Sequence, residues 1–98
     1  MAAAAYNGMG RALSAQGRWT EAAEDFRQAA DIEETPAFND FTDPPAFWYP
    51  VRRDVAAALL AGGDARGAKE AAEASLKLRT KDPVAEALLA KAASLAAR

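Results

Sequence analysis

Apolar residues recur at three- and four-residue spacings along most of this 98-residue chain, and glycine or proline interrupts them at intervals. Such spacing places the apolar side chains on one face of an α-helix. Alanine, the residue with the highest helix propensity, supplies more than a quarter of the sequence. The pattern therefore predicts an all-α chain in which about five helices pack as antiparallel pairs.

The expected helix boundaries follow from residues that cap or end helices. Gly17 suits a left-handed C-terminal cap, and Thr20 can cap the next helix with its side chain. Pro50, or Tyr49 before it, is expected to open the third helix, because a proline in the first turn loses no hydrogen bond. Asp64 can cap the fourth helix. The first two helices are expected at residues 3–15 and 20–33. The third is expected to start at residue 49 or 50, the fourth to follow the break at 62–64, and the fifth to follow the break at 81–83.

The composition argues against catalysis and against nucleic acid as a partner. The chain contains no histidine and no cysteine, which removes the commonest general base, thiolate nucleophiles and disulfides. Its 12 basic and 14 acidic residues give a net charge of −2, whereas binding to phosphates requires a clustered cationic face. We therefore expect no enzyme activity, no cofactor and no nucleic-acid partner.

A metal-binding site and a membrane-spanning segment are also not expected. The acidic residues near the middle of the chain do not have the spacing of a calcium-binding loop. No apolar run approaches the roughly 18 residues needed to span a bilayer. The cellular compartment stays open, with the cytoplasm favoured. The acidic residues that lack the spacing of a calcium-binding loop are Asp31, Glu33, Glu34, Asp40 and Asp43.

Two stretches of the chain share an order of small and large residues. The first contains Tyr6, Met9, Gly10, Leu13, Gly17, Trp19, Ala22, Phe26 and Ala29. The second contains Val55, Ala56, Leu59, Gly63, Ala68, Ala72 and Ser75. This order resembles the tetratricopeptide repeat (TPR), a helix–turn–helix unit. Gly10 and Ala22 are small where two helices would cross closely, and Phe26 would fill the space beside that contact.

The TPR resemblance implies a right-handed helical-repeat solenoid and covers nearly the whole chain as one domain, residues 1–98. The equivalent glycines, Gly17 and Gly63, lie 46 residues apart instead of the usual period of about 34, so an insertion is expected between the repeats. The second unit departs from the family pattern at Arg52 and Ala72, where large apolar residues are usual. The expected parts are a first repeat (3–34), an irregular insertion (35–47), a second repeat (48–80), and a capping helix or incomplete third repeat (82–98).

The insertion adjoins the most aromatic part of the chain. Residues 38–53 contain five of the eight aromatic residues and three of the five prolines. We expect Phe38, Phe41, Phe47 and Trp48 to fold back onto the alanine-rich core, because burying each one is worth about 1.5–3 kcal/mol. The alternative is that one or two of them, with Phe41 and Trp48 as candidates, form a groove wall or contact a partner chain. The run DPPAFWYPVRR also resembles a segment between the repeats of some bacterial TPR proteins, which implies a bacterial source.

In TPR proteins the first helix of each pair lines a concave surface, and the resemblance implies which residues would face a ligand there. Arg11 and Arg53 could together bind a peptide carboxylate through bidentate hydrogen bonds, although we favour an ordinary solvated helix face for both. The lysine-and-asparagine clamp of chaperone-binding TPR proteins is not reproduced, so no chaperone partner is implied. The residues expected on this surface are Asn7, Arg11, Ser14, Arg53, Ala57 and Leu60.

Two functions are consistent with the sequence. The first is a non-catalytic protein-interaction module that presents a concave helical surface to a peptide or a partner domain. The alternative is a structural or self-association segment that caps a longer TPR array, or an accessory segment of a larger enzyme. Repeat proteins usually need three or more units to bury a continuous core. We therefore expect the chain to be part of a longer one and, alone, to form a homo-oligomer or to be marginally stable.

Overall fold

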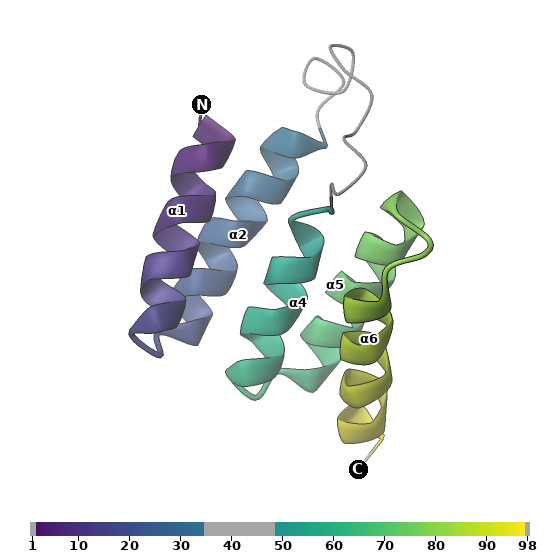
Figure 1. Cartoon of the computed structure of the whole chain (residues 1–98). Helices are drawn as coiled ribbons and strands as arrows, with labels where there is room; N and C mark the ends of the chain where they lie inside the picture. The colour runs from purple at the N-terminus through teal and green to yellow at the C-terminus, as the bar shows by residue number, and fades with distance from the viewer. Residues whose placement is uncertain (1, 35–48, 98) are drawn as a thin grey trace.

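The computed structural model describes residues 2–34 and 49–97, with side chains from residue 5 onward. All regular structure in this part of the chain is α-helical, which confirms the expected all-α class. Figure 1 shows the helices with their labels. They are α1 (Ala2–Ala15), α2 (Trp19–Glu33), α4 (Arg52–Ala61), α5 (Ala65–Leu78) and α6 (Pro83–Ala96).

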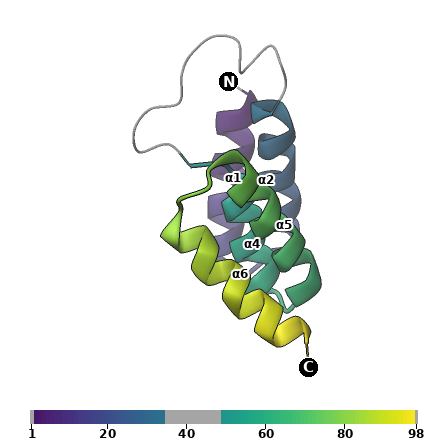
Figure 2. The ribbon, with the colours of Figure 1, turned by 90° about the vertical axis from the view of Figure 1, so that its right-hand side faces the viewer.

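Each of these helices packs against the next one along the chain. The principal contacts join α1 to α2, α2 to α4, α4 to α5 and α5 to α6, and α4 also contacts α6. The helices stand side by side, with α1 and α4 running in the same direction (Figure 1), and α6 crosses the front of the stack in the view of Figure 2. This order places α4, which contacts α2, α5 and α6, at the centre of the molecule, with α1 and α6 on opposite sides (Figure 1).

The same turn joins α1 to α2 and α4 to α5. Gly17 and Gly63 have φ angles of 73° and 92°, in the left-handed region that glycine adopts without strain. The amide of Gly17 donates to the Ser14 carbonyl at 3.0 Å, and the amide of the next residue donates to the Leu13 carbonyl at 2.9 Å. The equivalent bonds at Gly63 measure 3.1 and 2.8 Å. Both turns are therefore Schellman motifs, and the expected left-handed cap at Gly17 is confirmed.

The helix starts differ from expectation at two places. Thr20 does not cap α2, because the turn at Gly17 leads directly into the helix and Arg18 is the N-cap, without a side-chain cap bond. The third helix begins at Arg52, so Pro50 lies before it and is not in its first turn. Asp64, in contrast, caps α5 as expected, because its carboxylate accepts a hydrogen bond from the Gly67 amide at 2.9 Å.

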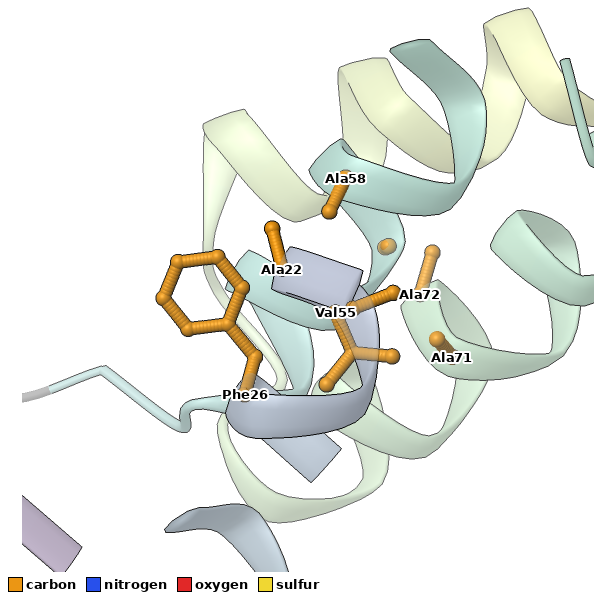
Figure 3. Close-up of a cluster of buried hydrophobic side chains, with 8 residues drawn as sticks. Ala22, Phe26, Val55, Ala58, Ala71 and Ala72 are labelled. Carbon is orange, nitrogen blue, oxygen red and sulfur yellow. The ribbon is translucent and has the colours of Figure 1, made fainter. Parts of the chain in front are cut away.

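The core between α2, α4 and α5 is built mainly from alanine. Phe26 of α2, only 4% exposed, is the largest side chain of this cluster, and Val55 of α4 is 1% exposed. Figure 3 shows these two among the small side chains around them. The buried alanines let the helix axes approach closely, and partly buried residues that include Leu13, Leu59 and Leu89 pack against the cluster. The alanines of the cluster are Ala22, Ala23, Ala56, Ala58, Ala71 and Ala72.

Two glycines of α1 are expected to respond oppositely to alanine. A Cβ atom on Gly10 would lie 2.7 Å from the Phe26 ring, whereas a Cβ on Gly8 would meet nothing within 4 Å. Both substitutions gain helix propensity of about 1 kcal/mol, but overpacking at Gly10 costs about 1–3 kcal/mol. We expect Gly8→Ala to raise the free energy of unfolding and Gly10→Ala to lower it by about 1 kcal/mol. Urea unfolding measures both; equal stabilisation by the two variants would contradict the close helix crossing.

Candidate functional site

A groove lies between α1 and α4, with α2 behind it. It has a volume of about 400 Å³. Small side chains on the α4 wall open it, because Ala57 and Ala61 extend only one carbon from the backbone. Phe26 and Trp19 of α2 supply apolar surface at its base. The residues that line this α1–α4 groove are Arg11, Ser14, Trp19, Phe26, Asp54, Ala57, Ala58 and Ala61.

One end of the groove is polar and is built around Asp54. Its Oδ2 atom accepts hydrogen bonds from Asn7 Nδ2 at 3.3 Å and from the Tyr49 hydroxyl at 3.4 Å. The same hydroxyl accepts a hydrogen bond from Arg11 Nη2 at 3.3 Å. All three bonds are long compared with the usual 2.7–3.0 Å. Asp54 is therefore weakly satisfied, and within the described residues its second oxygen, Oδ1, accepts no hydrogen bond.

The surroundings of Asp54 shift its acidity. Burial raises the pKa of the Asp54 carboxyl above its ordinary value, because the charged form loses hydration. The hydrogen bond from Asn7 lowers the pKa, and so do the positive charges of Arg11 and Arg53 and the hydrogen bond from Tyr49. The net shift is upward, so these partners do not fully replace the lost water.

The raised pKa predicts that ionised Asp54 costs folding free energy at neutral pH. The carboxyl ionises at a lower pH in the unfolded chain than in the folded one, so the cost exists above the folded pKa. It disappears as the pH falls towards the unfolded value of about 3.9. We expect Asp54→Asn to be more stable than the wild type at pH 7, with no difference at pH 3. Urea unfolding of both chains at each pH checks this, and a less stable variant at pH 7 would contradict it.

Arg53, for which the sequence predicts a solvated helix face or a place on the ligand surface, is instead mostly buried and paired within the protein. Its Nη1 atom donates to both carboxylate oxygens of Asp82 at 3.1 Å. Asp82 is 2% exposed and also caps α6, because it accepts from the Val84 amide at 3.1 Å. The guanidinium stacks on the Tyr49 ring, with 3.5 Å between Cζ and the ring centroid. Arg53 thus anchors the start of α6.

The structure brings Arg11 and Arg53 to the same residue, but each has an internal partner. Arg11 reaches the hydroxyl of Tyr49 and Arg53 covers its ring. The carboxylate of Asp82 already takes the place that we considered for a peptide carboxylate at Arg53. A ligand group that approaches this end of the groove therefore meets Arg11 at the rim and Asp54 further in.

The other residues expected to face a ligand have different positions. Ser14 and Ala57 line the α1–α4 groove, while Asn7 holds Asp54 at its end. Leu60 is half-buried and does not line the groove. The candidates of the aromatic insertion, Phe41 and Trp48, lie outside the described residues, as do Phe38 and Phe47, so their core or partner role stays a prediction.

Sequence reasoning missed the contacts that tie α2 to the start of α4. Arg52 Nε donates to Glu34 at 2.8 Å, and Arg52 Nη2 donates to Asp31 at 2.6 Å. Glu33 accepts from the Val51 amide at 3.0 Å. Burial lowers the pKa of Arg52, but both carboxylates more than offset this, so the pKa is raised. The sequence contained one indication of these contacts between α2 and α4, because Arg52 stands where the repeat pattern usually has a large apolar residue.

The same contacts account for part of the acidic run. Asp31, Glu33 and Glu34 all serve the junction between α2 and α4. In the part of the chain that the structure describes, no three acidic side chains are gathered so that they could hold a metal ion. Asp40 and Asp43 lie outside the described residues.

A second hollow surface lies along α6. It has a volume of about 390 Å³ and is lined by Pro83, Val84, Ala87, Leu88 and Lys91. Val84 is 51% exposed, and Leu95 on the same helix is 37% exposed. This side of α6 therefore presents aliphatic side chains to solvent around a single lysine.

None of the family models, curated proteins or solved structures compared with the chain matches it. Among the described residues, no helix has the length and apolar character that crossing a membrane requires.

Proposed function

We propose that the chain is a non-catalytic protein-interaction module that binds a peptide segment of a partner protein in the α1–α4 groove. The observation that carries this proposal is the groove itself, which combines an apolar base with a polar end. The half-buried Trp19 and the exposed alanines of the α4 wall offer surface to an apolar side chain, and Arg11 and Asp54 offer hydrogen bonds to the peptide around it. Peptide-binding grooves in proteins commonly combine these two features.

The proposal includes a TPR-like arrangement of the helices. The two Schellman turns at Gly17 and Gly63 have matching hydrogen bonds, which supports two equivalent helix pairs. The packing of α4 on α2 and of α6 on α5 repeats one relation between successive pairs. In this arrangement α1 and α4 are the first helices of their pairs, and the groove between them lies on the concave side.

Peptide binding in the groove can be tested by a substitution that fills the groove. Ala57 is exposed on the α4 wall, so Ala57→Leu adds bulk to the groove without entering the core. The matched control is Ala90→Leu, the same change at an exposed position of α6 outside the groove. Peptides selected from a displayed library on the wild type are then measured by isothermal titration with all three proteins. We expect Ala57→Leu to weaken binding by at least about tenfold and Ala90→Leu to leave it unchanged.

Two results would overturn the proposal. One is a library that yields no peptide with measurable affinity for the folded wild type. The other is a set of selected peptides that bind Ala57→Leu as tightly as the wild type, which would place their site elsewhere. Circular dichroism of both variants shows whether each keeps the helical fold.

The exposed side of α6 supports a second candidate, self-association or packing against further helices of a longer array. Val84 and Leu88 there are apolar and accessible in part. Binding of a partner at this surface would be weakened by Val84→Lys but not by Ala57→Leu, because Val84 is exposed and lies outside the core. Sedimentation at micromolar concentration tests self-association: a stable monomer would exclude it.

A further inference from the structure

The shape and lining of the α1–α4 groove suit a flat, bulky side chain. Its volume of about 400 Å³ is several times that of one small aliphatic group. The half-buried Trp19 at the base presents aromatic surface, with the edge of the nearly buried Phe26 beside it, and Ala57 and Ala61 on the wall leave a smooth face. Aromatic rings contact one another favourably in offset or edge-to-face geometry, so an aromatic ligand gains more here than an aliphatic one.

A hydrogen-bond acceptor stands at one end of this apolar groove. Asp54 lines it, and the hydrogen bonds from Asn7 and Tyr49 both go to Oδ2. Within the described residues Oδ1 has no hydrogen-bond donor. A hydrogen bond to a charged acceptor is stronger than one between neutral groups, so a ligand donor placed at Oδ1 would contribute substantially.

The charges around Asp54 select a neutral donor. The guanidinium group of Arg11 acts electrostatically on this carboxylate, so it would repel a ligand ammonium group placed beside it, whereas the charge of Arg53 is already paired with Asp82. A ligand carboxylate in the same place would be repelled by Asp54 itself. An uncharged N–H or O–H avoids both costs.

We infer that the α1–α4 groove receives an aromatic side chain with a neutral hydrogen-bond donor, the indole of a tryptophan or the phenol of a tyrosine. The ring lies against Trp19 and the α4 wall, and its N–H or O–H donates to Asp54 Oδ1. This inference rests on the proposed function and specifies the anchor residue of the bound peptide.

Amino-acid amides test the anchor directly. The chain labelled with ¹⁵N is titrated with N-acetyl-tryptophanamide, with its 1-methyl analogue, which lacks the indole N–H, and with the tyrosine and phenylalanine amides. Amide shifts are followed in α1, α2 and α4. We expect the tryptophan amide to bind about tenfold more tightly than its 1-methyl analogue, and the tyrosine amide more tightly than the phenylalanine amide.

Asp54→Ala removes the acceptor and is expected to abolish the preference for the ligand with the donor, while the 1-methyl analogue binds as before. Glu86→Ala, which removes an exposed carboxylate of α6, is the matched control and should keep the preference. If Asp54→Ala fails to fold, the comparison of the two tryptophan ligands on the wild type still decides the inference.

The outcomes separate this inference from the proposed function. Equal affinity for the tryptophan amide and its 1-methyl analogue would overturn the anchor and leave peptide binding intact. Chemical-shift changes at groove residues with the selected peptides, but not with any aromatic amide, would also contradict the aromatic anchor and leave peptide binding intact. If neither the amides nor the peptides change the chemical shifts of groove residues, both the aromatic anchor and the proposed function are contradicted.

Discussion

Replacing Phe26 by alanine is expected to lower the free energy of unfolding by about 3–5 kcal/mol. Phe26 is 4% exposed, belongs to an alanine-rich core cluster and lies against Gly10 of α1, and such small residues cannot fill the space that it leaves. A domain of this size has a total stability of about 5–15 kcal/mol, so the variant should lose a large part of it. Urea unfolding followed by circular dichroism measures the change.

The control for this substitution is Phe26→Leu, which keeps most of the buried volume and should cost clearly less. A loss below about 1 kcal/mol for Phe26→Ala would show that the side chain does not fill the core. The double variant of Gly10→Ala with Phe26→Leu adds a check on geometry. Because the three atoms nearest to the added Cβ all belong to the Phe26 ring, leucine at 26 should reduce the cost of alanine at 10.

Replacing Asp82 by alanine is expected to destabilise the chain by about 2–4 kcal/mol. The change removes the cap of α6 and leaves the Arg53 guanidinium without its carboxylate partner. Loss of one partner of a buried pair is usually worth about 3–5 kcal/mol, but the Arg53 side chain is 20% exposed and regains part of its hydration. Thermal and urea unfolding measure the effect.

Asp64→Ala serves as the matched control, because Asp64 also caps a helix but is exposed and forms no ion pair in the described part of the chain. Its loss should cost about 1 kcal/mol. Asp82→Asn, which can still cap α6 without carrying charge, should lie between the two. Equal effects of Asp82→Ala and Asp64→Ala would show that the pair with Arg53 adds nothing to stability.

The helical elements of this protein could be predicted because their signals are local. Apolar spacing marks each helix, and a glycine that needs a positive φ marks both turns. Gly17 shows this well, since its left-handed conformation follows from its place after an apolar run. Asp64 and Pro83 mark helix starts for equally local reasons, a side-chain cap and a proline at the first helical position.

The contacts at the site could not be predicted, because they join residues far apart in the sequence. Nothing near Arg53 indicates that Asp82, 29 residues later, neutralises it. Asp54 was not considered as a site residue, since it gains its place through Asn7, 47 residues earlier. Thr20 shows the opposite failure: its residue type fits a cap, but the preceding turn already starts the helix at Trp19.

The place where a peptide binds is measured by a map of amide chemical shifts for the ¹⁵N-labelled chain with a peptide selected on the wild type. Binding in the α1–α4 groove predicts the largest changes at Arg11, Ser14, Ala57 and Ala61, and their loss in Ala57→Leu. Changes gathered instead at Val84, Leu88 and Lys91 of α6, and kept in Ala57→Leu, would contradict it.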